Sequence, residues 1–258
     1  MIEVHNLTFG YSSTEDGQIL KGVDFAAKNG KLTALIGTNG AGKSTLLKTI
    51  MGILKGKGDI TINGKSVAEY STKDFSSTVS YLSQDNDCRV NLTVFEVVML
   101  GRMGSMSFRV SDEDIAATQE VLDRLNLQRF ASRSIMELSG GQRQLVFMAQ
   151  ALVKEPKILI LDEPTSALDL HKQFDLLTLL KNLTQENDFT TLVTLHHLDL
   201  AAMFADEIIV LKEGRVYAQG APKDIFTEAM MEDVYRVRTK IYMDDKGMPH
   251  VIPLEAIN

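Results

Sequence analysis

Runs of apolar residues separated by polar turns predict a series of strands along the chain. Apolar and polar positions alternate over residues 2–9, and residues 20–27 also have the pattern of a strand, so the chain should open with short antiparallel strands. Residues 33–36 are mostly apolar, which is typical of a buried strand. Further strands are predicted at residues 59–62, 79–82, 157–161, 190–195, 207–211 and 216–219, and a hairpin at 240–243 and 250–254.

Helical patterns of apolar residues lie between these strands. Residues 43–51 carry their apolar side chains on one helical face, and residues 170–185 predict a longer amphipathic helix. From about 85 to 153 the chain reads as helices with polar breaks, which open at the capping sequences of Thr93, Ser111 and Ser139. We therefore expect an α/β fold with a mixed sheet and an N-terminal antiparallel β-subdomain. Residues 1–84 and 154–258 would form the core, and residues 85–153 an inserted helical subdomain.

Composition narrows the class of protein. The net charge of −7 argues against a broad basic surface, so we expect no nucleic-acid partner. The single cysteine, Cys88, leaves no internal disulfide and suits a reducing compartment. The first residues do not resemble a signal peptide, and no apolar run approaches the roughly 18 residues that span a bilayer. If the protein works at a membrane, another chain must supply the span.

The strongest chemical signal directly follows the buried strand at residues 33–36. The sequence from Gly37 to Ser44 is an uninterrupted G-x-x-x-x-G-K-S that lies between a strand and a helix, the context of a phosphate-binding loop. Glycines let the backbone N–H groups surround phosphate oxygens, and the following helix adds the positive end of its dipole. Lys43 would reach the β- and γ-phosphates, and the Ser44 hydroxyl would ligate Mg²⁺. The expected nucleotide-binding residues here are Gly37, Thr38, Asn39, Gly40, Ala41, Gly42, Lys43, Ser44 and Thr45.

Two acidic residues at a strand end supply the expected partners of the phosphate loop. Asp162 directly follows the predicted strand 157–161, which is apolar after its lysine. A carboxylate that holds Mg²⁺ through water is expected at this position. Glu163 follows it, and because successive side chains of a strand diverge, the two carboxylates can do different work. We assign Glu163 to polarise the attacking water. Without the phosphate loop, the pair would equally fit a plain acidic turn.

A second anion-binding candidate is the sequence Ser139-Gly140-Gly141-Gln142. It opens a predicted helix, and its small residues expose backbone N–H groups, which favours a phosphate. The same four residues also form an ordinary Ser-x-x-Gln capping box that needs no ligand. A single ATP would use both helix ends only if they approach it from opposite sides.

With these motifs in place, the chain resembles the ATP-binding subunits of ABC transporters over nearly its whole length. Leu138 to Gln142 is similar to the family signature, about twenty residues before the acidic pair. The resemblance implies a P-loop NTPase core within a single nucleotide-binding domain, residues 1–258, with ATP and Mg²⁺ as cofactors. It also implies roles for residues that the pattern alone does not single out: Tyr11 stacks on adenine, Gln84 meets Mg²⁺ and water, Asp169 in Ser166-Ala167-Leu168-Asp169 links two ATP sites, and His196 lies near the γ-phosphate.

In this family two subunits pair head to tail, so the resemblance implies a second copy of this chain as a partner. Each ATP would lie between the phosphate loop of one copy and the residues Ser139, Gly140, Gly141 and Gln142 of the other. The catalytic residues would be Lys43, Gln84, Glu163 and His196, and the metal ligands Ser44, Gln84 and Asp162. The sequence departs from the family at His197, where an acidic residue is usual, and at Gln150, where many relatives have arginine.

The resemblance extends to importers of iron–siderophore, haem or cobalamin, on the segment Leu100-Gly101-Arg102 and the tail sequences near Val234 and Val251. It implies an ATPase coupled to a polytopic membrane permease and, through it, to a substrate-binding protein. The chain would be cytoplasmic and peripheral on the inner face of the membrane. The alternative is a soluble ABC-type ATPase of an assembly scaffold, such as one for iron–sulphur clusters.

Overall fold

The computed structural model describes residues 1–12, 17–84, 91–103 and 110–257, so the single cysteine, Cys88, lies outside the described residues. The chain divides into two compact units. The first joins Met1–Glu69 with Leu180–Asn258, and the second is Tyr70–Leu179. The boundaries that the sequence predicts for the helical subdomain, at about 85 and 153, stay a prediction.

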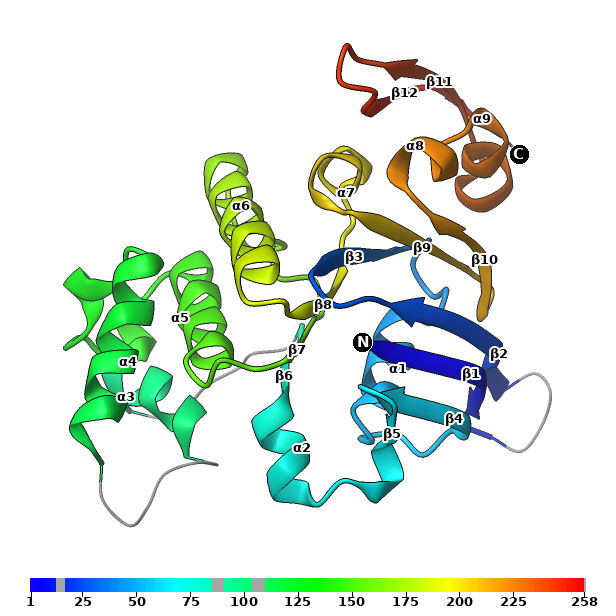
Figure 1. Ribbon diagram of the computed structural model, residues 1–258. Helices are drawn as coiled ribbons and strands as arrows, with labels where there is room; N and C mark the ends of the chain where they lie inside the picture. Colours follow the sequence, from blue (N-terminus) through cyan, green and yellow to red (C-terminus); the bar gives the residue numbers. More distant parts are fainter. Residues whose placement is uncertain (13–16, 85–90, 104–109, 258) are drawn as a thin grey trace. The chain divides into compact units, whose positions relative to one another are not determined.

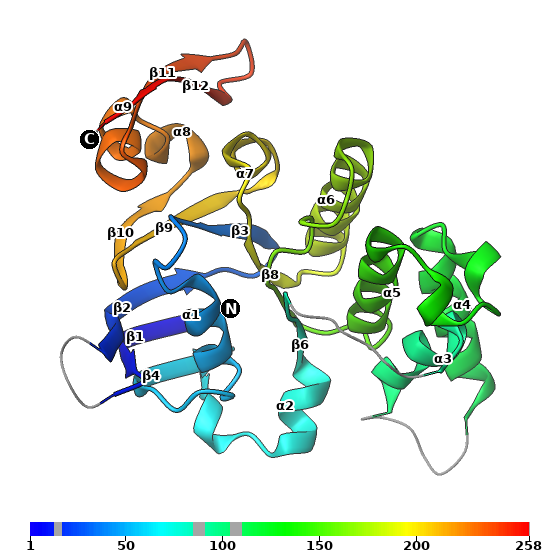
Figure 2. The same cartoon turned by 180° about the vertical axis from the view of Figure 1, so that it is seen from behind.

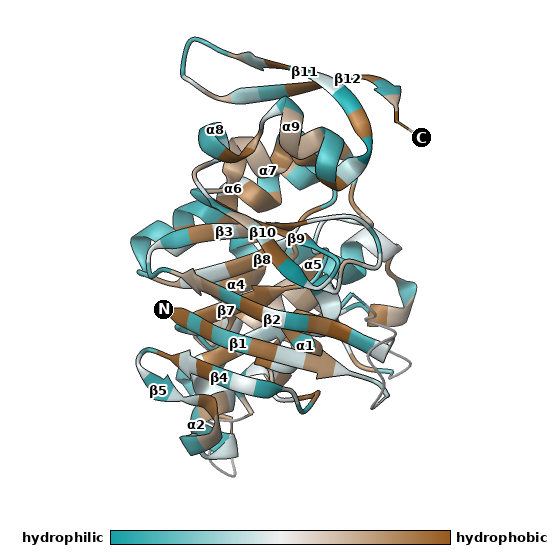
Figure 3. Ribbon diagram, turned by 90° about the vertical axis from the view of Figure 1, so that its right-hand side faces the viewer, coloured by the Kyte–Doolittle hydropathy of each residue, from teal (hydrophilic) through white to brown (hydrophobic). Residues whose placement is uncertain are grey.

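The start of the chain forms an antiparallel sheet with the strand order β2-β1-β4-β5. Val4 of β1 lies opposite Phe25 on one side and Ile60 on the other. Figure 3 shows apolar and polar residues alternating along β1, and both Figure 1 and Figure 2 show β1 between β2 and β4. Alternation of this kind buries one face of a sheet. The strands are β1 (Ile2–Gly10), β2 (Gln18–Ala27), β4 (Lys57–Ile62) and β5 (Lys65–Ser66).

A second, mixed set of strands in the first unit contains the buried strand before the phosphate loop. β3 (Lys31–Ile36) pairs in parallel with β8 (Thr190–Thr194) and with β9 (Glu207–Lys212). β9 pairs in turn with β10 (Arg215–Gly220), which runs antiparallel. β3 is buried from Leu32 to Ile36, as expected of a strand covered on both faces. The predicted mixed sheet and N-terminal antiparallel strands are therefore confirmed.

Short helices and a hairpin complete the first unit. α1 (Lys43–Ile50) follows the phosphate loop and buries Leu46, Leu47 and Ile50 on one face, as the sequence predicts. α7 (Leu198–Phe204) follows β8. The predicted tail hairpin is confirmed, with Tyr242 of β11 (Val237–Met243) opposite His250 of β12 (Pro249–Ala256). The remaining elements are the 3₁₀ turn η2 (Val67–Glu69), α8 (Pro222–Ile225), α9 (Glu228–Met230) and the π-helix η6 (Met231–Tyr235).

The second unit is built around a parallel pair of strands. β6 (Val79–Leu82) pairs with β7 (Ile158–Leu161), so both strands end at the same edge. The helix starts predicted at Thr93, Ser111 and Ser139 are confirmed. Each is a capping box: the hydroxyl accepts the N–H of the third residue after it, and the side chain of that third residue accepts the N–H of the capping residue. The helices are α2 (Thr72–Thr78), α3 (Val94–Met99), α4 (Asp112–Arg124), α5 (Gly140–Leu152) and the start of α6 (Leu170–Glu186), with the 3₁₀ turns η3 (Leu100–Arg102), η4 (Gln128–Phe130) and η5 (Ile135–Glu137).

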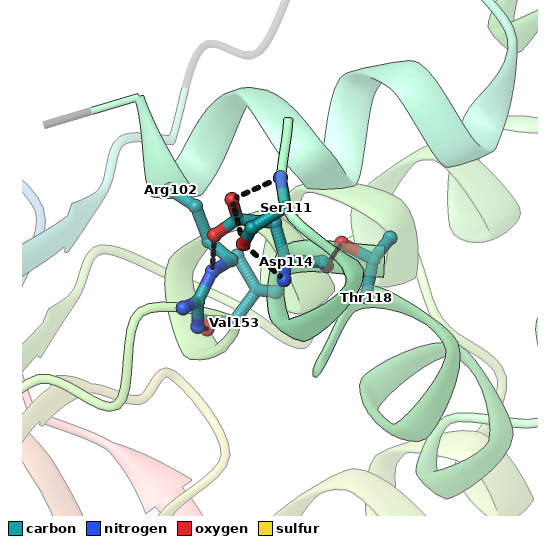
Figure 4. A network of polar contacts seen from close by, with 5 residues as sticks. All are labelled: Arg102, Ser111, Asp114, Thr118 and Val153. Carbon is teal, nitrogen blue, oxygen red and sulfur yellow. Dashed lines mark hydrogen bonds and ion pairs between the residues drawn. The ribbon is translucent and has the colours of Figure 1, made fainter. Parts of the chain in front are cut away.

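A polar network joins three of these segments, as Figure 4 shows. Arg102 donates through Nε to Oδ1 of Asp114 at 2.6 Å and through Nη1 to the carbonyl of Val153 at 3.2 Å. Ser111 donates to the other oxygen of Asp114 from its backbone N–H at 3.0 Å and its hydroxyl at 2.7 Å. These bonds lower the pKa of Asp114 to about 2, the Arg102 hydrogen bond contributing most. The network therefore joins the end of η3 and the start of α4 to the end of α5.

Candidate functional site

The phosphate loop in the first unit has a backbone path that only glycine follows easily. Gly37 has φ +149°, and a Cβ there would lie 2.2 Å from the carbonyl oxygen of Leu211. Gly42 has φ +105° and is the N-cap of α1, with no side-chain hydrogen bond to the first turn. A helix N-terminus without a side-chain cap presents N–H groups of the kind that bind anionic oxygens.

Lys43 lies inside this loop. Its side chain is buried, and its ammonium donates to the carbonyls of Gly37 at 2.8 Å and Thr38 at 3.0 Å. A positive charge is thus held beside the N-terminus of α1, and both features attract anionic oxygens. The arrangement has the chemistry of a phosphate cradle.

The hairpin turn between β9 and β10 is hydrogen-bonded to the phosphate loop. The N–H of Gly214 donates to the carbonyl of Ala41 at 3.1 Å, and the carbonyl of Gly214 accepts from Lys21 at 2.8 Å. Gly214 itself has no room for a side chain, because a Cβ would lie 2.0 Å from the carbonyl oxygen of Ile19. Sequence reasoning missed this support, although the Lys-Glu-Gly-Arg turn marks its position.

The other expected residues of the first unit are accessible to a ligand. Tyr11 is 71% exposed, and its ring makes an edge contact with that of Phe9, with ring centroids 5.0 Å apart. An exposed aromatic face of this kind can stack on a base. His196 is exposed just beyond the end of β8, whereas His197 is the N-cap residue of α7 and makes no side-chain cap bond. The two histidines thus have different positions in the fold.

In the second unit, the ends of β6 and β7 bring together three of the predicted residues. Leu82 of β6 accepts the backbone N–H of Asp162 at 2.8 Å, and the Asp162 side chain is almost completely buried. The Nε2 of Gln84 donates to Oε2 of Glu163 at 2.8 Å. Glu163 has φ +52°, an uncommon backbone conformation for a residue other than glycine. The distance between the two side chains shows that Gln84 and Glu163 form one polar cluster.

The Ser139 sequence forms a complete capping box at the start of α5. The N–H of Gln142 donates to the Ser139 hydroxyl at 3.3 Å, and the Gln142 amide oxygen accepts the N–H of Ser139 at 2.9 Å. Ser139 and Gly140 are exposed, and nothing lies within 4 Å of a Cβ built on Gly140. The structural role of the box is therefore confirmed, and an anion-binding role stays a prediction.

Asp169 begins α6, at the end of the loop that starts with Glu163. Its carboxylate accepts the backbone N–H of Lys172 at 3.0 Å and pairs with the Lys172 ammonium at 3.0 Å. These contacts, the backbone hydrogen bond first, lower the pKa of Asp169. Asp169 is thus an N-capping residue of the helix in this structure.

The residues fit a hard divalent cation such as Mg²⁺ by the chemistry of their donors. In the second unit Gln84 offers an amide and Asp162 a buried carboxylate, and in the first unit Ser44 offers a hydroxyl. Mg²⁺ prefers oxygen ligands of these kinds together with waters and substrate phosphates. Across the described ranges, no group of three or more His, Cys, Asp or Glu side chains forms a separate metal cluster.

The motifs at the ends of the strands match a known family. A family model described as ABC transporter matches residues 20–166. The chain belongs to the ABC transporter family. It is 38% identical to an uncharacterized ABC transporter ATP-binding protein of Methanocaldococcus jannaschii, over 98% of both chains. It is 36% identical to the iron(3+)-hydroxamate import ATP-binding protein FhuC of Bacillus subtilis, over 95% of this chain and 91% of that protein. It is also 36% identical to the ferric enterobactin transport ATP-binding protein FepC of Escherichia coli, over 96% and 92%.

Solved structures agree with this assignment to the ABC family. An inward-facing metal-chelate type ABC transporter superposes with a TM-score of 0.83 at 28% identity, covering 98% of this chain and 97% of that one. A dimeric ATP-binding cassette in a post-hydrolysis state, bound to ADP and Pi, gives a TM-score of 0.77 at 30% identity, covering 86% and 98%. The ABC chain is accordingly an ATPase, and the predicted fold class is confirmed. None of the helices in the described part of the chain has the length and apolarity to span a bilayer.

Proposed function

We propose that this ABC ATPase powers an importer of iron–siderophore or chemically related metal–chelate cargo, the class that includes haem and cobalamin. The supporting observation is the extent of the similarity. Relatives named for hydroxamate and enterobactin transport match nearly the whole chain, well beyond the family segment 20–166. The metal-chelate type structure covers 98% of the chain, against 86% for the isolated cassette dimer. Similarity that extends beyond the family segment favours a transport task shared with these relatives.

In the proposed reaction, water attacks the γ-phosphate of ATP in line with the leaving group. Glu163 orients this water and takes its proton, and Gln84 holds the Glu163 carboxylate in place through the 2.8 Å hydrogen bond. Lys43 and the N-terminus of α1 stabilise the charge that develops on the phosphate oxygens. Ser44, Gln84 and Asp162 would hold Mg²⁺, which adds positive charge when bound. His196 would contact the γ-phosphate, and Tyr11 would stack on adenine.

The proposed assembly contains a second copy of this chain. Ser139, Gly140, Gly141 and Gln142 would meet the nucleotide bound by the partner's phosphate loop, and Asp169 would lie between the two sites. Support comes from the exposed start of α5 and from the dimeric cassettes among the structural neighbours. Because ATP can close a dimer only by binding the closed state more tightly, the bound nucleotide would set the dimer equilibrium.

A cavity of about 380 Å³ in the second unit is the proposed contact with the permease. Leu100 and Phe147 line it together with the polar side chains of Ser80, Gln150 and Lys154. Lys154 donates to the carbonyl of Val79 at 2.8 Å, and burial lowers the pKa of its ammonium. This mixture of apolar and polar groups fits a short amphipathic segment. Through the permease the chain would be peripheral on the cytoplasmic face of the membrane and would serve a substrate-binding protein.

Co-purification tests this function. In detergent, the wild type should retain a polytopic permease and should keep its ATPase activity. Leu100→Asp, which places a charge at the cavity, should lose the permease while the isolated chain still hydrolyses ATP. Ile53→Asp is the control, because Ile53 is similarly exposed but does not line the cavity. Retention of a soluble assembly scaffold instead of a permease would contradict the proposal.

A further inference from the structure

The loop from Glu163 to Asp169 is made of two consecutive turns. The carbonyl of Glu163 accepts the N–H of Ser166 at 3.2 Å and the Ser166 hydroxyl at 3.0 Å. The carbonyl of Thr165 accepts the N–H of Leu168 at 3.1 Å. Turns of this size hold their own shape weakly, because each is closed by one or two hydrogen bonds. The conformation of this loop therefore depends on what is bonded to it from outside.

Gln173, in the first turn of α6, makes that external connection. It is only 7% exposed, and its Nε2 donates to the carbonyl of Leu168 at 2.9 Å and to the carbonyl of Thr165 at 3.2 Å. Its backbone N–H donates to the carbonyl of Asp169 at 2.9 Å. The amide of this one side chain thus donates hydrogen bonds to the carbonyls of the first and last residues of the second turn.

Two functional groups depend on the position of this loop. Glu163 begins it with a strained φ of +52°, and strain of this kind persists only where the surroundings fix the backbone. Ala167, at the middle, packs so closely on the start of α5 that a Cβ on Gly141 would lie 2.8 Å from the Ala167 carbonyl oxygen. A shift of the second turn would therefore disturb both Glu163 and the Ser139–Gln142 box.

We propose that Gln173 is a positioning residue for ATP hydrolysis. By donating hydrogen bonds to the carbonyls of Thr165 and Leu168, it fixes the backbone of Glu163 and so keeps the Glu163 carboxylate hydrogen-bonded to Gln84. Gln173 touches no nucleotide in this scheme and acts only through the loop. The inference rests on the proposed role of Glu163 as the group that orients the attacking water. Removal of the amide takes away the Gln173 donor from both carbonyls and leaves the Thr165 carbonyl with only the N–H of Leu168, so the second turn is held less firmly.

The main test is Gln173→Met, which keeps the length of the side chain and removes both donors. We expect kcat of the full-length chain to fall about 10-fold or more, with the KM for Mg-ATP within about twofold of wild type, because the phosphate loop is unchanged. Asn187→Leu is the matched control: it removes a side-chain amide that donates to a backbone carbonyl, that of Leu183 at 3.0 Å, at the other end of α6. Its kcat should stay at the wild-type value.

A double-mutant cycle separates this inference from the proposed function. Single-turnover phosphate release is measured for Glu163→Gln, Gln173→Met and the double variant. If Gln173 acts through Glu163, the double variant should be no slower than Glu163→Gln alone. If Glu163→Gln keeps wild-type turnover, the proposed role of Glu163 is wrong. If Glu163→Gln is inactive while folded Gln173→Met keeps wild-type kcat, or if the two losses multiply, the Gln173 inference is wrong.

Gln173→His provides a second variant in case Gln173→Met does not fold. Its ring N–H can donate one of the two bonds, so kcat should fall less than in Gln173→Met while KM stays constant. A folded Gln173→His with wild-type kcat, or with KM raised in proportion to the loss of kcat, would overturn the proposal.

Discussion

At the phosphate loop, two glycines carry different constraints although both have positive φ. Gly37 has φ +149° and directly faces the Leu211 carbonyl, whereas Gly40 has φ +80° and nothing within 4 Å of a built Cβ. A side chain at Gly40 meets only the cost of the left-handed conformation, and a side chain at Gly37 also meets a steric clash. The space around each glycine therefore decides whether a side chain is tolerated there, and this space cannot be predicted from the sequence.

We expect Gly40→Ala to lower the free energy of unfolding by about 1–2 kcal/mol, the strain of a left-handed residue. Gly37→Ala should lower the free energy of unfolding by a further ~1–3 kcal/mol through overpacking against Leu211, and should abolish nucleotide binding. Urea unfolding of the two variants and wild type measures the difference. Equal stability of the two variants would contradict the clash at Gly37.

Lys43 provides a second prediction at this scale. Lys43→Ala should reduce phosphate release by at least about 100-fold, because the loop loses the charge that neutralises the γ-phosphate. Lys48→Ala is the control, since Lys48 lies in the last turn of the same helix α1, away from the loop. A malachite-green assay that finds Lys43→Ala as active as Lys48→Ala would exclude the proposed role of Lys43.

Among the site residues, those with a recognisable motif and strand context could be predicted from sequence, and those defined by backbone geometry could not. The placement of Asp162 at a buried strand end and the Ser139 capping box follow from local pattern. The strain of Glu163 does not, because nothing in Leu-Asp-Glu-Pro specifies a positive φ. The sequence pattern does not single out Gln173 in its amphipathic helix either, because its role depends on the two carbonyls that it contacts in the fold.

At the scale of elements, local hydrogen bonds determine where the helices of the second unit begin. Capping boxes form at the three predicted helix starts, since Ser or Thr followed three residues later by Glu, Asp or Gln satisfies two helix donors at once. In the described part of the chain, the helices α2, α7 and the four-residue α8 were not predicted. α2 (Thr72–Thr78) has no buried residue, so it has no apolar stripe to detect, and α7 has seven residues, too few to establish a helical period.

The Arg102–Asp114 network makes stability depend on acid pH. Because Asp114 has its pKa lowered from 3.8 to about 2 in the folded state, its stabilising effect is complete above about pH 4 and is lost as pH falls through about 2. Asp114→Asn should therefore destabilise the protein at pH 5 and lessen the loss of stability between pH 4 and pH 2. Denaturant unfolding across this range measures both effects.

Asp112→Asn is the control for this prediction, because Asp112 lies in the same first turn of α4. It removes the same charge without breaking the bond to Arg102. If Asp112→Asn and Asp114→Asn had the same pH profile, the effect would come from net charge rather than from the network.

At the scale of the whole molecule, the expected catalytic, nucleotide-binding and metal-binding residues are divided between the two units. The first unit carries Tyr11, Lys43 and His196, and the second carries Gln84, Asp162, Glu163 and the Ser139–Gln142 box. α6 runs from the second unit into the first, so one helix joins the loop after Glu163 to the strand that precedes His196.

The most direct test of the account is the assembly state of Glu163→Gln in the presence of Mg-ATP. The substitution should slow hydrolysis by about 10²–10⁴-fold, so that ATP persists and the closed state accumulates. Sedimentation velocity should then show a dimer with Mg-ATP and a monomer with Mg-ADP, and the double variant Lys43→Ala/Glu163→Gln should stay monomeric. A Glu163→Gln protein that binds Mg-ATP and remains a monomer would contradict the claim that two copies of this chain enclose the nucleotide.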